Sequence, residues 1–530
     1  MTDWASGYVA DIEYLPGFYA EQAPSHLMLG CLVNGIEPPV VSGPFTYCEL
    51  GCGQGVTALV IAASNPQAEV VATDFNPAHI ARARAMAKAA GLTNIRFLEL
   101  SFADMGGHGD LPDFDMVSLH GVWSWISAED REHITRFLSQ KVKPGGVVSV
   151  SYNAMPGWTA LLPMQRLLLE QARHSPARSD QQVLKGLEWI ERLQGAGSGV
   201  LGNATLLEQL RKGSGTGGAP DRAVYLAHEY LNANWHPQYH MDTAALLAQA
   251  KLGYIGSASL IDNFPDLSLK PEQRALLAEA PAGPLRETLK DYLVSRPFRR
   301  DLYVRGPRLM PDILRDRCLS TFGLALSIPP HEARTELDVP AGKAQLPERF
   351  YRPVIAALAR RPHSLAELVD LPDLRGLAGA PTMVELAGVL VGSGQALPLP
   401  PDGAKTTGEG AAQDPNQDQF AGVVRLNRIL SLEVAEQRAV SASIAAPRAG
   451  SGLSLTTMEG AVFHALATGV PADPQSLTDH IFARILASGT PLAREGVVIA
   501  DAEEQRKIIG ESVDWCLRIR LPLWTSLGAL

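Results

Sequence analysis

The chain has 530 residues, of which 46% are hydrophobic and 19% charged, and its formal net charge is −10. A chain of this length has room for roughly three to four domains of ordinary size. The acidic balance argues against a broad nucleic-acid-binding face, because contacts with phosphates need a basic surface. The five cysteines are too few and too scattered for a disulfide framework, which suits a reducing compartment.

The N-terminal 45 residues are rich in aromatic side chains. The start of the chain lacks a basic segment followed by an apolar stretch, and no run of about 18 apolar residues follows anywhere. We therefore expect a soluble, cytoplasmic protein without a signal peptide or membrane insertion. Tyr8, Tyr14, Phe18 and Tyr19 precede an apolar helical run at residues 26–33. These aromatic residues either staple that helix to the core or fold over a ligand as a lid.

A glycine-rich turn between two apolar strands is the most informative motif of the chain. Residues 47–50 end the first expected strand, Gly51, Gly53 and Gly55 form the turn, and a second strand ends in Asp74. A carboxylate about 20 residues beyond such a turn is typical of a nucleoside-binding βαβ unit. The glycines let the backbone approach the ligand closely, and the acid accepts hydrogen bonds from ribose hydroxyls.

The kind of nucleoside follows from what the turn contains and lacks. The pattern G-x-G-x-G lacks the third glycine that packs a helix against a bound pyrophosphate, and Glu49 before the turn would repel a phosphate. An anionic residue there suits a cationic ligand such as S-adenosylmethionine, which carries a sulfonium and an ammonium group. Residues 49–53 resemble motif I of the class I methyltransferases, with Asp74 as the ribose acid. A nicotinamide dehydrogenase and a glycine turn without a ligand are the alternatives.

The elements after this turn alternate between helix and strand. Asn76 caps a helix that ends at Gly91, and Ser127 caps another that runs to about residue 142. Strands are expected to end at residues 74, 100, 119 and 152. This alternation predicts an α/β fold with a mostly parallel sheet. The resemblance implies that the sheet is Rossmann-like and seven-stranded.

The rest of the chain is expected to be mainly helical. Glycine-rich segments at residues 195–199 and 213–218 mark the first domain boundary. Short helices are expected at residues 350–360, 364–371 and 383–391, before a strand at 396–399, a pattern compatible with a winged helix. The expected units are an aromatic lid segment (1–45), a methyltransferase domain (46–195), a helical regulatory or dimerisation domain (196–335), a winged-helix-like middle domain (340–400), a mobile loop (401–419) and a C-terminal domain (420–530).

Further motifs narrow the resemblance to bacterial methyltransferases that carry a regulatory domain, among them the rickettsial protein lysine methyltransferases that modify outer-membrane proteins. The motifs lie at residues 119–125, 151–158, 225–231, 237–239 and 252–255. The resemblance covers residues 8–305 well and the remainder loosely. It implies S-adenosylmethionine as cofactor, S-adenosylhomocysteine as product, and a protein substrate such as an outer-membrane or surface protein. A homodimer is compatible with it.

The candidate site residues follow from the strand ends and from the resemblance. The expected cofactor contacts are Tyr14, Tyr19, Glu49, Gly51, Cys52, Gly53, Gly55, Asp74, Phe75, Asn76, Ser101, Phe102, Ala103, His120 and Gly121. The expected catalytic or acceptor-channel residues are Tyr14, His120, Trp123, Trp125 and Tyr152, and Trp158 is a further candidate for the channel wall. Aromatic walls would favour the neutral form of a lysine amine, although an indole such as Trp123 is equally at home in a core. His120 can remove a proton or bind the cofactor, and we favour cofactor contact.

Three interpretations of function remain open at this point. The leading one is methylation of lysine side chains, and the second is methylation of a small metabolite or natural product. The third is a regulator that binds the cofactor and contacts DNA through the winged helix, helped by arginines at residues 349–361. His228, His236 and His240 lack a zinc-binding pattern, so we expect capping or core hydrogen bonds there and no metal.

Overall fold

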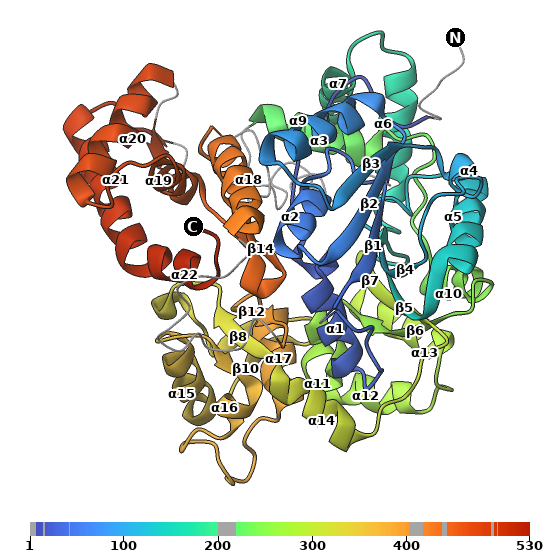
Figure 1. Cartoon of the computed structure of the whole chain (residues 1–530). Coiled ribbons are helices and arrows are strands. Elements are labelled where there is room, and N and C mark those ends of the chain that lie inside the picture. The colour runs from blue at the N-terminus through green and yellow to red at the C-terminus, as the bar shows by residue number, and fades with distance from the viewer. Residues whose placement is uncertain are drawn as a thin grey trace.

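The computed structural model describes residues 7–13, 16–41, 43–199, 219–401, 417–436, 443–488, 492–494 and 497–530. The chain folds into an α/β part, a middle part and a C-terminal helical part, which lie at the right, the bottom left and the upper left of Figure 1. Among the described residues, no helix combines the length and the apolar character needed to cross a bilayer.

A seven-stranded sheet forms the centre of the α/β part, in the order β3-β2-β1-β4-β5-β7-β6. Its strands are β1 (Phe45–Leu50), β2 (Ala68–Asp74), β3 (Ile95–Glu99), β4 (Phe114–Leu119), β5 (Val142–Asn153), β6 (Leu252–Ser257) and β7 (Phe298–Arg305). The strands β1 to β5 pair in parallel, whereas β7 is antiparallel to both of its neighbours. The predicted α/β fold with a mostly parallel, Rossmann-like sheet is therefore confirmed.

Helices cover both faces of this sheet, as the burial of parallel strands requires. One face carries α1 (Pro24–Val33), α2 (Val56–Ser64) and α3 (Pro77–Ala90), and the other carries α4 (Phe102–Met105), α5 (Ala128–Lys141) and α10 (His240–Ala248) (Figure 1). Neighbouring residues of a strand pack alternately into the hydrophobic cores on the two faces of the sheet. Tyr47, for example, packs on the α2 side and Cys48 on the α5 side. The limits of α3 agree with the prediction, since Asn76 accepts a hydrogen bond from the Ala78 N–H and Gly91 ends the helix.

The sheet extends beyond the predicted methyltransferase boundary at residue 195. Its strands β6 and β7 come from residues 252–305, which the sequence assigned to a separate helical domain. A helical insertion follows β5 and interrupts the alternation of strands and helices. The sequence pattern near residues 252–305 therefore did not indicate that these two strands join the central sheet. The insertion includes α6 (Leu162–Arg173), α7 (Ser179–Gly195) and α9 (Ala219–Tyr230), while α11 (Pro265–Ser268), α12 (Pro271–Ala278) and α13 (Pro284–Val294) separate β6 from β7. Val9 of the N-terminal segment shares the apolar cluster of α6, α7 and α9.

The middle part contains a small antiparallel sheet. Its elements are α14 (Asp312–Thr321), β8 (Gly323–Leu326), β9 (Glu336–Val339), β10 (Gly342–Gln345), α15 (Glu348–Leu358), β11 (His363–Ser364), α16 (Leu365–Val369), α17 (Met383–Gly392) and β12 (Ala396–Leu399). The three short helices and the strand expected after residue 350 are thus confirmed. The expected start at residue 340 is too late, because β8 pairs with both β11 and β12 and forms the centre of the sheet.

The packing of α17 argues against a DNA-reading role for the middle part. In a winged-helix protein, the corresponding helix lies in the major groove of the duplex. Here α17 packs against α1 and the short helix η2 (Leu260–Asn263) of the α/β part. A Cβ added at Gly388 would overlap the Phe264 ring, and one at Gly392 would lie 2.9 Å from Ile261. This helix face is therefore already occupied by the chain itself.

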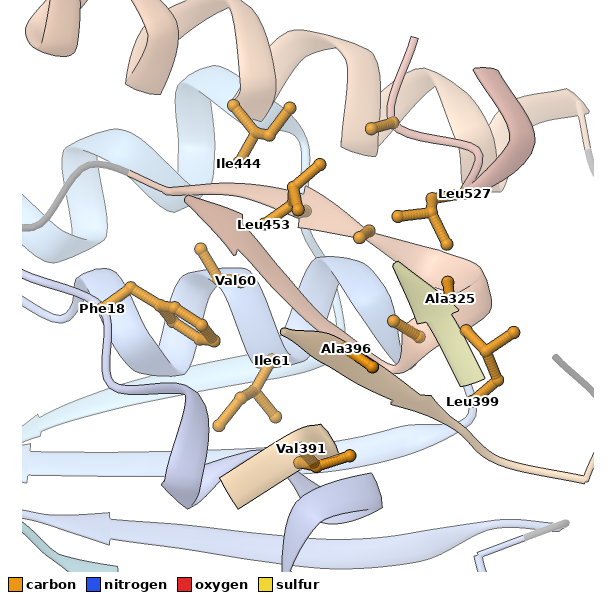
Figure 2. Packing of buried hydrophobic residues seen from close by; sticks show 14 of the residues in the cluster. Phe18, Val60, Ile61, Ala325, Val391, Ala396, Leu399, Ile444, Leu453 and Leu527 are labelled. Carbon is orange, nitrogen blue, oxygen red and sulfur yellow. The ribbon is translucent and has the colours of Figure 1, made fainter. Parts of the chain in front are cut away.

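The C-terminal part joins the α/β part through a β-hairpin. Its elements are α18 (Gln417–Ala435), β13 (Ser443–Ala446), β14 (Ser451–Ser454), α19 (Thr457–Ala467), α20 (Pro474–Ser488), α21 (Ala502–Trp515) and α22 (Leu521–Ser526). In Figure 2 the hairpin β13–β14 separates α2, with Val60 and Ile61, from the C-terminal helices, towards which Ile444 and Leu453 point. All nine residues of α2 are buried.

Polar contacts fix this hairpin to the end of α2. Ser64 Oγ donates a hydrogen bond to the Ser451 carbonyl over 2.7 Å, and Asn65 donates one to the Gly450 carbonyl over 3.0 Å. These carbonyls belong to the tip of the hairpin, so both hydrogen bonds are specific to this arrangement of the two parts. The hairpin therefore has one defined position on the glycine-turn helix.

Three expectations fall on segments outside the described residues. These are Tyr14, the glycine-rich piece at residues 213–218, and residues 402–416 of the expected mobile loop. The last residues of that expected loop, 417–419, instead begin α18.

Candidate active site

A cavity of about 1030 Å³ lies at the carboxyl edge of the sheet, where ligands bind in folds of this kind. The N-terminal segment and α9 contribute to its walls together with the strand ends. The cavity is lined by most of the residues that the sequence singles out, namely Tyr19, Glu49, Gly51, Cys52, Gly53, Gly55, Asp74, Phe75, Ser101, Phe102, His120, Gly121 and Trp125.

The three glycines of the turn serve two different purposes. All three have positive φ, at 70°, 52° and 77° for Gly51, Gly53 and Gly55. A Cβ would lie 2.5 Å from Val122 at Gly51 and 2.6 Å from Phe97 at Gly55, so these two glycines are needed for packing. A Cβ at Gly53 would meet no protein atom within 4 Å. Gly53 therefore keeps space open for a ligand.

Asp74 is held rigidly at the end of β2. Its Oδ2 accepts a hydrogen bond from the Gly53 N–H over 2.8 Å, and its Oδ1 accepts one from the Asn76 N–H over 2.9 Å. Each carboxylate oxygen has a further lone pair, so the group can still accept hydrogen bonds from two ligand hydroxyls. This geometry suits the two neighbouring hydroxyls of a ribose.

Glu49 is a buried carboxylate with one unsatisfied oxygen. The residue is 4% exposed, and its Oε2 has no hydrogen-bond partner in the described part of the chain. Burial raises the pKa of Glu49 to about 8, against the lowering effect of the Ala58 N–H. A buried acceptor without a partner is unfavourable until a donor arrives. The position therefore fits the ammonium group of an amino-acid moiety such as that of S-adenosylmethionine.

His120 lies in the cavity as a neutral imidazole. Burial lowers its pKa to about 4, which makes it a weak base near neutral pH. Its ring stacks on Tyr19 at 3.7 Å between centroids. Ser151 Oγ accepts a hydrogen bond from the Gly121 N–H and also lies 3.1 Å from His120 Nδ1, so a hydrogen bond between hydroxyl and ring fixes the orientation of the imidazole. This arrangement suits a positioning contact better than proton removal.

The charge of the cavity favours a cationic ligand. Among the described residues that line it, six are carboxylates and one is an arginine. The carboxylates are Glu49, Asp74, Glu99, Asp104, Asp130 and Glu229. Arg300 is paired with Glu21 of the N-terminal segment, which offsets its charge. Within the described ranges, no group of three or more histidine, cysteine or acidic side chains is arranged to hold a metal ion.

Four of the expected site residues do not line the cavity. Trp123 is fully buried in the core on the α5 side of the sheet, so its expected place in an acceptor channel is wrong. Tyr152 is also fully buried, and its hydroxyl donates a hydrogen bond to Asp301 over 2.6 Å. Asn76 caps α3, and Ala103 lies in α4 without reaching the cavity. Their sequence positions are adjacent to lining residues, but their side chains face elsewhere.

Several lining residues are absent from the expected set. Tyr8 is not among the expected cofactor contacts, but it is one of the aromatic residues expected either to staple a helix or to cover a ligand. It lines the cavity and meets Phe75 edge-to-face, with 5.9 Å between ring centroids. From α9, Tyr225 and Glu229 also line the cavity. These α9 residues lie in a motif of the regulatory-domain resemblance, which was the one sequence signal that could have drawn attention to them.

Comparisons with known proteins agree with this geometry. Residues 48–148 match the family model of a methyltransferase domain, and residues 222–305 match that of a predicted methyltransferase regulatory domain. The uncharacterized protein sll1526 of Synechocystis sp. is 30% identical over 526 residues, which cover 99% of both chains. The uncharacterized protein RP028 of Rickettsia prowazekii is 27% identical over 160 residues, or 30% of this chain and 62% of that one. The structure of PKMT2 from Rickettsia typhi in complex with AdoHcy has a TM-score of 0.67 and 18% identity, and covers 97% of this chain and 99% of that chain.

Proposed function

Because the chain belongs to the class I S-adenosylmethionine-dependent methyltransferases that carry a regulatory domain, we propose that it methylates lysine side chains of a protein substrate. The cofactor and the methyl-transfer class, EC 2.1.1, follow from the family. The identity of the acceptor is the part that is proposed.

The observation that carries this proposal is the large, acidic and aromatic cavity. Its volume of about 1030 Å³ is at the upper end of the range of roughly 300–1000 Å³ for ligand pockets, so an acceptor side chain fits beside the cofactor. Trp125, Trp158 and Phe298 line it with apolar surface suited to the methylene groups of a lysine. The carboxylates of the wall attract the ammonium group at its end.

The similarity to PKMT2 gives independent support for a protein acceptor. That similarity extends over almost the whole chain, including the middle and C-terminal parts. A methyltransferase acting on a small metabolite has no evident need for these additional parts. The rickettsial protein lysine methyltransferases, which the motifs resemble, act on outer-membrane proteins, so a surface-protein substrate is the first to test.

Each of these cavity residues has its own role in the proposed reaction. Bound S-adenosylmethionine supplies an electrophilic methyl group for in-line displacement. Glu49 binds the cofactor ammonium and Asp74 its ribose, while Gly53 leaves room for it. The neutral His120 holds a contact without adding a positive charge beside a sulfonium. Trp125 excludes water from the acceptor side, because its indole is 9% exposed and lies against Gly121.

Radiolabelled cofactor tests the proposal. The purified enzyme is incubated with a host lysate that has been separated into protein and small-molecule fractions, and labelled protein is hydrolysed to identify methyllysine. We expect label in the protein fraction as methyllysine, none with Gly53→Val, and slower labelling with Trp125→Ala at unchanged affinity for S-adenosylhomocysteine. Label confined to small molecules would instead establish the alternative, a methyltransferase of metabolites or natural products.

A further inference from the structure

Glu229 is a third buried carboxylate at the cavity wall, after Glu49 and Asp74. It lies in the last turns of α9, is 8% exposed, and lines the cavity. In the described part of the chain its carboxylate forms no hydrogen bond or ion pair, and the Arg222 guanidinium acts on it through its charge alone. A buried charge without a partner is costly, so such a group commonly has a role in binding.

Several buried acids outside the cavity are paired with arginine. Asp301 accepts a hydrogen bond from Arg299 over 2.8 Å, and Glu459 lies 2.8 Å from Arg520. In each pair the arginine compensates the charge of the buried acid, so neither charge is left without a partner inside the protein. Glu229 differs from them because its carboxylate faces a cavity instead of a cation. A purely structural explanation therefore does not account for its presence.

The surroundings of Glu229 are aromatic. Burial and then the charge of Glu229 raise the pKa of Tyr225 and Tyr230, and burial, Asp74 and Glu229 raise that of Tyr8. These phenols therefore remain neutral at physiological pH. The Trp158 ring lies 6.0 Å from Tyr230, which extends the aromatic wall.

Glu229 is also separate from the cofactor contacts. Glu49 and Asp74 project from the ends of β1 and β2, whereas Glu229 comes from the helical insertion that covers the cavity. Tyr19 stacks on His120 at the end of β4, and Tyr225 of α9 lines the same cavity. The α9 wall is thus supplied by a different part of the chain from the residues expected to hold the cofactor.

We propose that Glu229 binds the ammonium group of the acceptor and removes its proton before methyl transfer; this rests on the proposed lysine acceptor. One N–H proton passes from the ammonium to a carboxylate oxygen of Glu229. The neutral amine nitrogen then forms a bond to the methyl carbon, while the S–C bond breaks and its electron pair goes to sulfur. The product is a methylated ammonium, and the proton on Glu229 leaves to solvent.

The pKa of Glu229 suits this role. Burial raises it to about 7, against the lowering effect of the Arg222 guanidinium. A carboxyl of this pKa is a stronger base than an ordinary carboxylate and is still ionised in part at neutral pH. The charged and titratable groups that act on it or face it are Arg222, Tyr225 and Tyr230 from α9 and Tyr8 from the N-terminal segment. The phenols stay neutral, so at saturating cofactor, where Glu49 no longer limits binding, the acid limb of the rate profile is expected to reflect Glu229.

The test compares Glu229→Gln with Glu229→Asp and with Glu188→Gln, a matched change at an exposed position of α7. Two readouts are used. The first is calorimetric binding of n-pentylamine, a mimic of the lysine side chain, to the protein loaded with S-adenosylhomocysteine. The second is the pH profile of methyl transfer to the labelled protein fraction. We expect Glu229→Gln to weaken pentylamine binding about tenfold or more and to lose the acid limb near pH 7, with partial recovery in Glu229→Asp.

The assignment of Glu229 would be overturned if the Glu229→Gln variant bound pentylamine as tightly as the unmodified protein and had the same pH profile. This would hold even if methyllysine is found in the protein fraction. Loss of pentylamine binding alongside label confined to small molecules would support Glu229 as an amine-binding residue and refute the lysine acceptor. If Glu229→Gln also loses affinity for S-adenosylhomocysteine, pentylamine binding by the Glu229→Asp variant decides the question. Equal loss in that variant overturns the proposal, and retained pentylamine binding supports it.

Discussion

Glu49→Gln is the most informative single perturbation of the cofactor site. The substitution keeps the shape of the side chain and removes its ability to ionise. The unsatisfied Oε2 and the pKa of about 8 both indicate that the ligand-free protein holds Glu49 largely as a neutral acid near neutral pH. Binding of a cationic ammonium favours the ionised form, because an opposite charge nearby stabilises the carboxylate. Cofactor binding should therefore release a proton.

The size of the effect follows from that pKa. With a pKa of about 8, about 1% of Glu49 is ionised at pH 6 and about a quarter at pH 7.5. If binding requires the carboxylate, affinity rises about 20-fold between these two pH values, or about 2 kcal/mol. The sign is fixed by the raised pKa, since affinity must increase as the pH approaches it from below. Glu49→Gln should bind nearly as well as the unmodified protein at the lower pH and about 20-fold more weakly at the higher one.

Calorimetric titration with S-adenosylhomocysteine measures both quantities. The affinity is recorded at several pH values, and the number of protons released is obtained from buffers of different ionisation enthalpy. Glu188→Gln, an exposed change of the same kind on α7, is the control and should follow the unmodified protein. Glu229 also titrates in this range, but it is present in all three proteins and cancels from their comparison.

Two results would refute this reasoning. One is an affinity of the unmodified protein that does not change between pH 6 and 7.5. The other is a Glu49→Gln profile that runs parallel to that of the unmodified protein, which would mean that another group takes up the proton. Either result would remove Glu49 from the ammonium site and leave the Asp74 and Gly53 assignments untouched.

Three further expectations concern other parts of the molecule. Asp74→Ala should weaken S-adenosylhomocysteine binding about 100-fold or more by calorimetry, because two hydrogen bonds to a charged acceptor are lost. Gly452→Ala should lower the free energy of unfolding by about 1–3 kcal/mol in denaturant titrations, since its Cβ would lie 2.7 Å from Phe18, and a Phe18→Ala background should abolish most of that loss. Burial alone would raise the pKa of Asp301, but Arg299 and His240 hold it well below its usual range. Its ionised form thus stabilises the fold above the unfolded pKa and less as the pH falls, so Asp301→Asn should destabilise by about 3–5 kcal/mol near neutral pH and flatten the acid limb of stability.

The cofactor side of the site could be predicted because its signals are local. The glycines, Glu49 and Asp74 lie within a single βαβ unit, where strand ends and turn geometry determine the position of each group. Their spacing in the sequence therefore determines their relative positions in the site. The same holds for the cap of α3 and for the short helices of the middle part, which begin at Ser364 and Thr382 with capping boxes.

Side-chain direction at the strand ends could not be predicted. In a parallel sheet both faces are apolar, so the alternation that separates inside from outside in a half-exposed strand is missing. Trp123 and Tyr152 follow the correct strands but face the core instead of the cavity. Their neighbours Trp125 and Asn153 line the cavity. A shift of one or two positions decided between core and site, and sequence composition does not distinguish these cases.

The contribution of the regulatory segment could not be predicted either, because it depends on contacts between distant residues. Residues 222–305 supply the strands β6 and β7 of the central sheet and also the cavity wall that bears Glu229. This segment is thus part of the catalytic fold and not a separate domain beside it. A regulatory effect exerted through it would need no long path, since any shift of α9 would move Glu229 and Tyr225 directly. The C-terminal hairpin has a similar position on the other side, where it covers α2 and places Gly452 against Phe18, one residue before Tyr19 at the cavity wall.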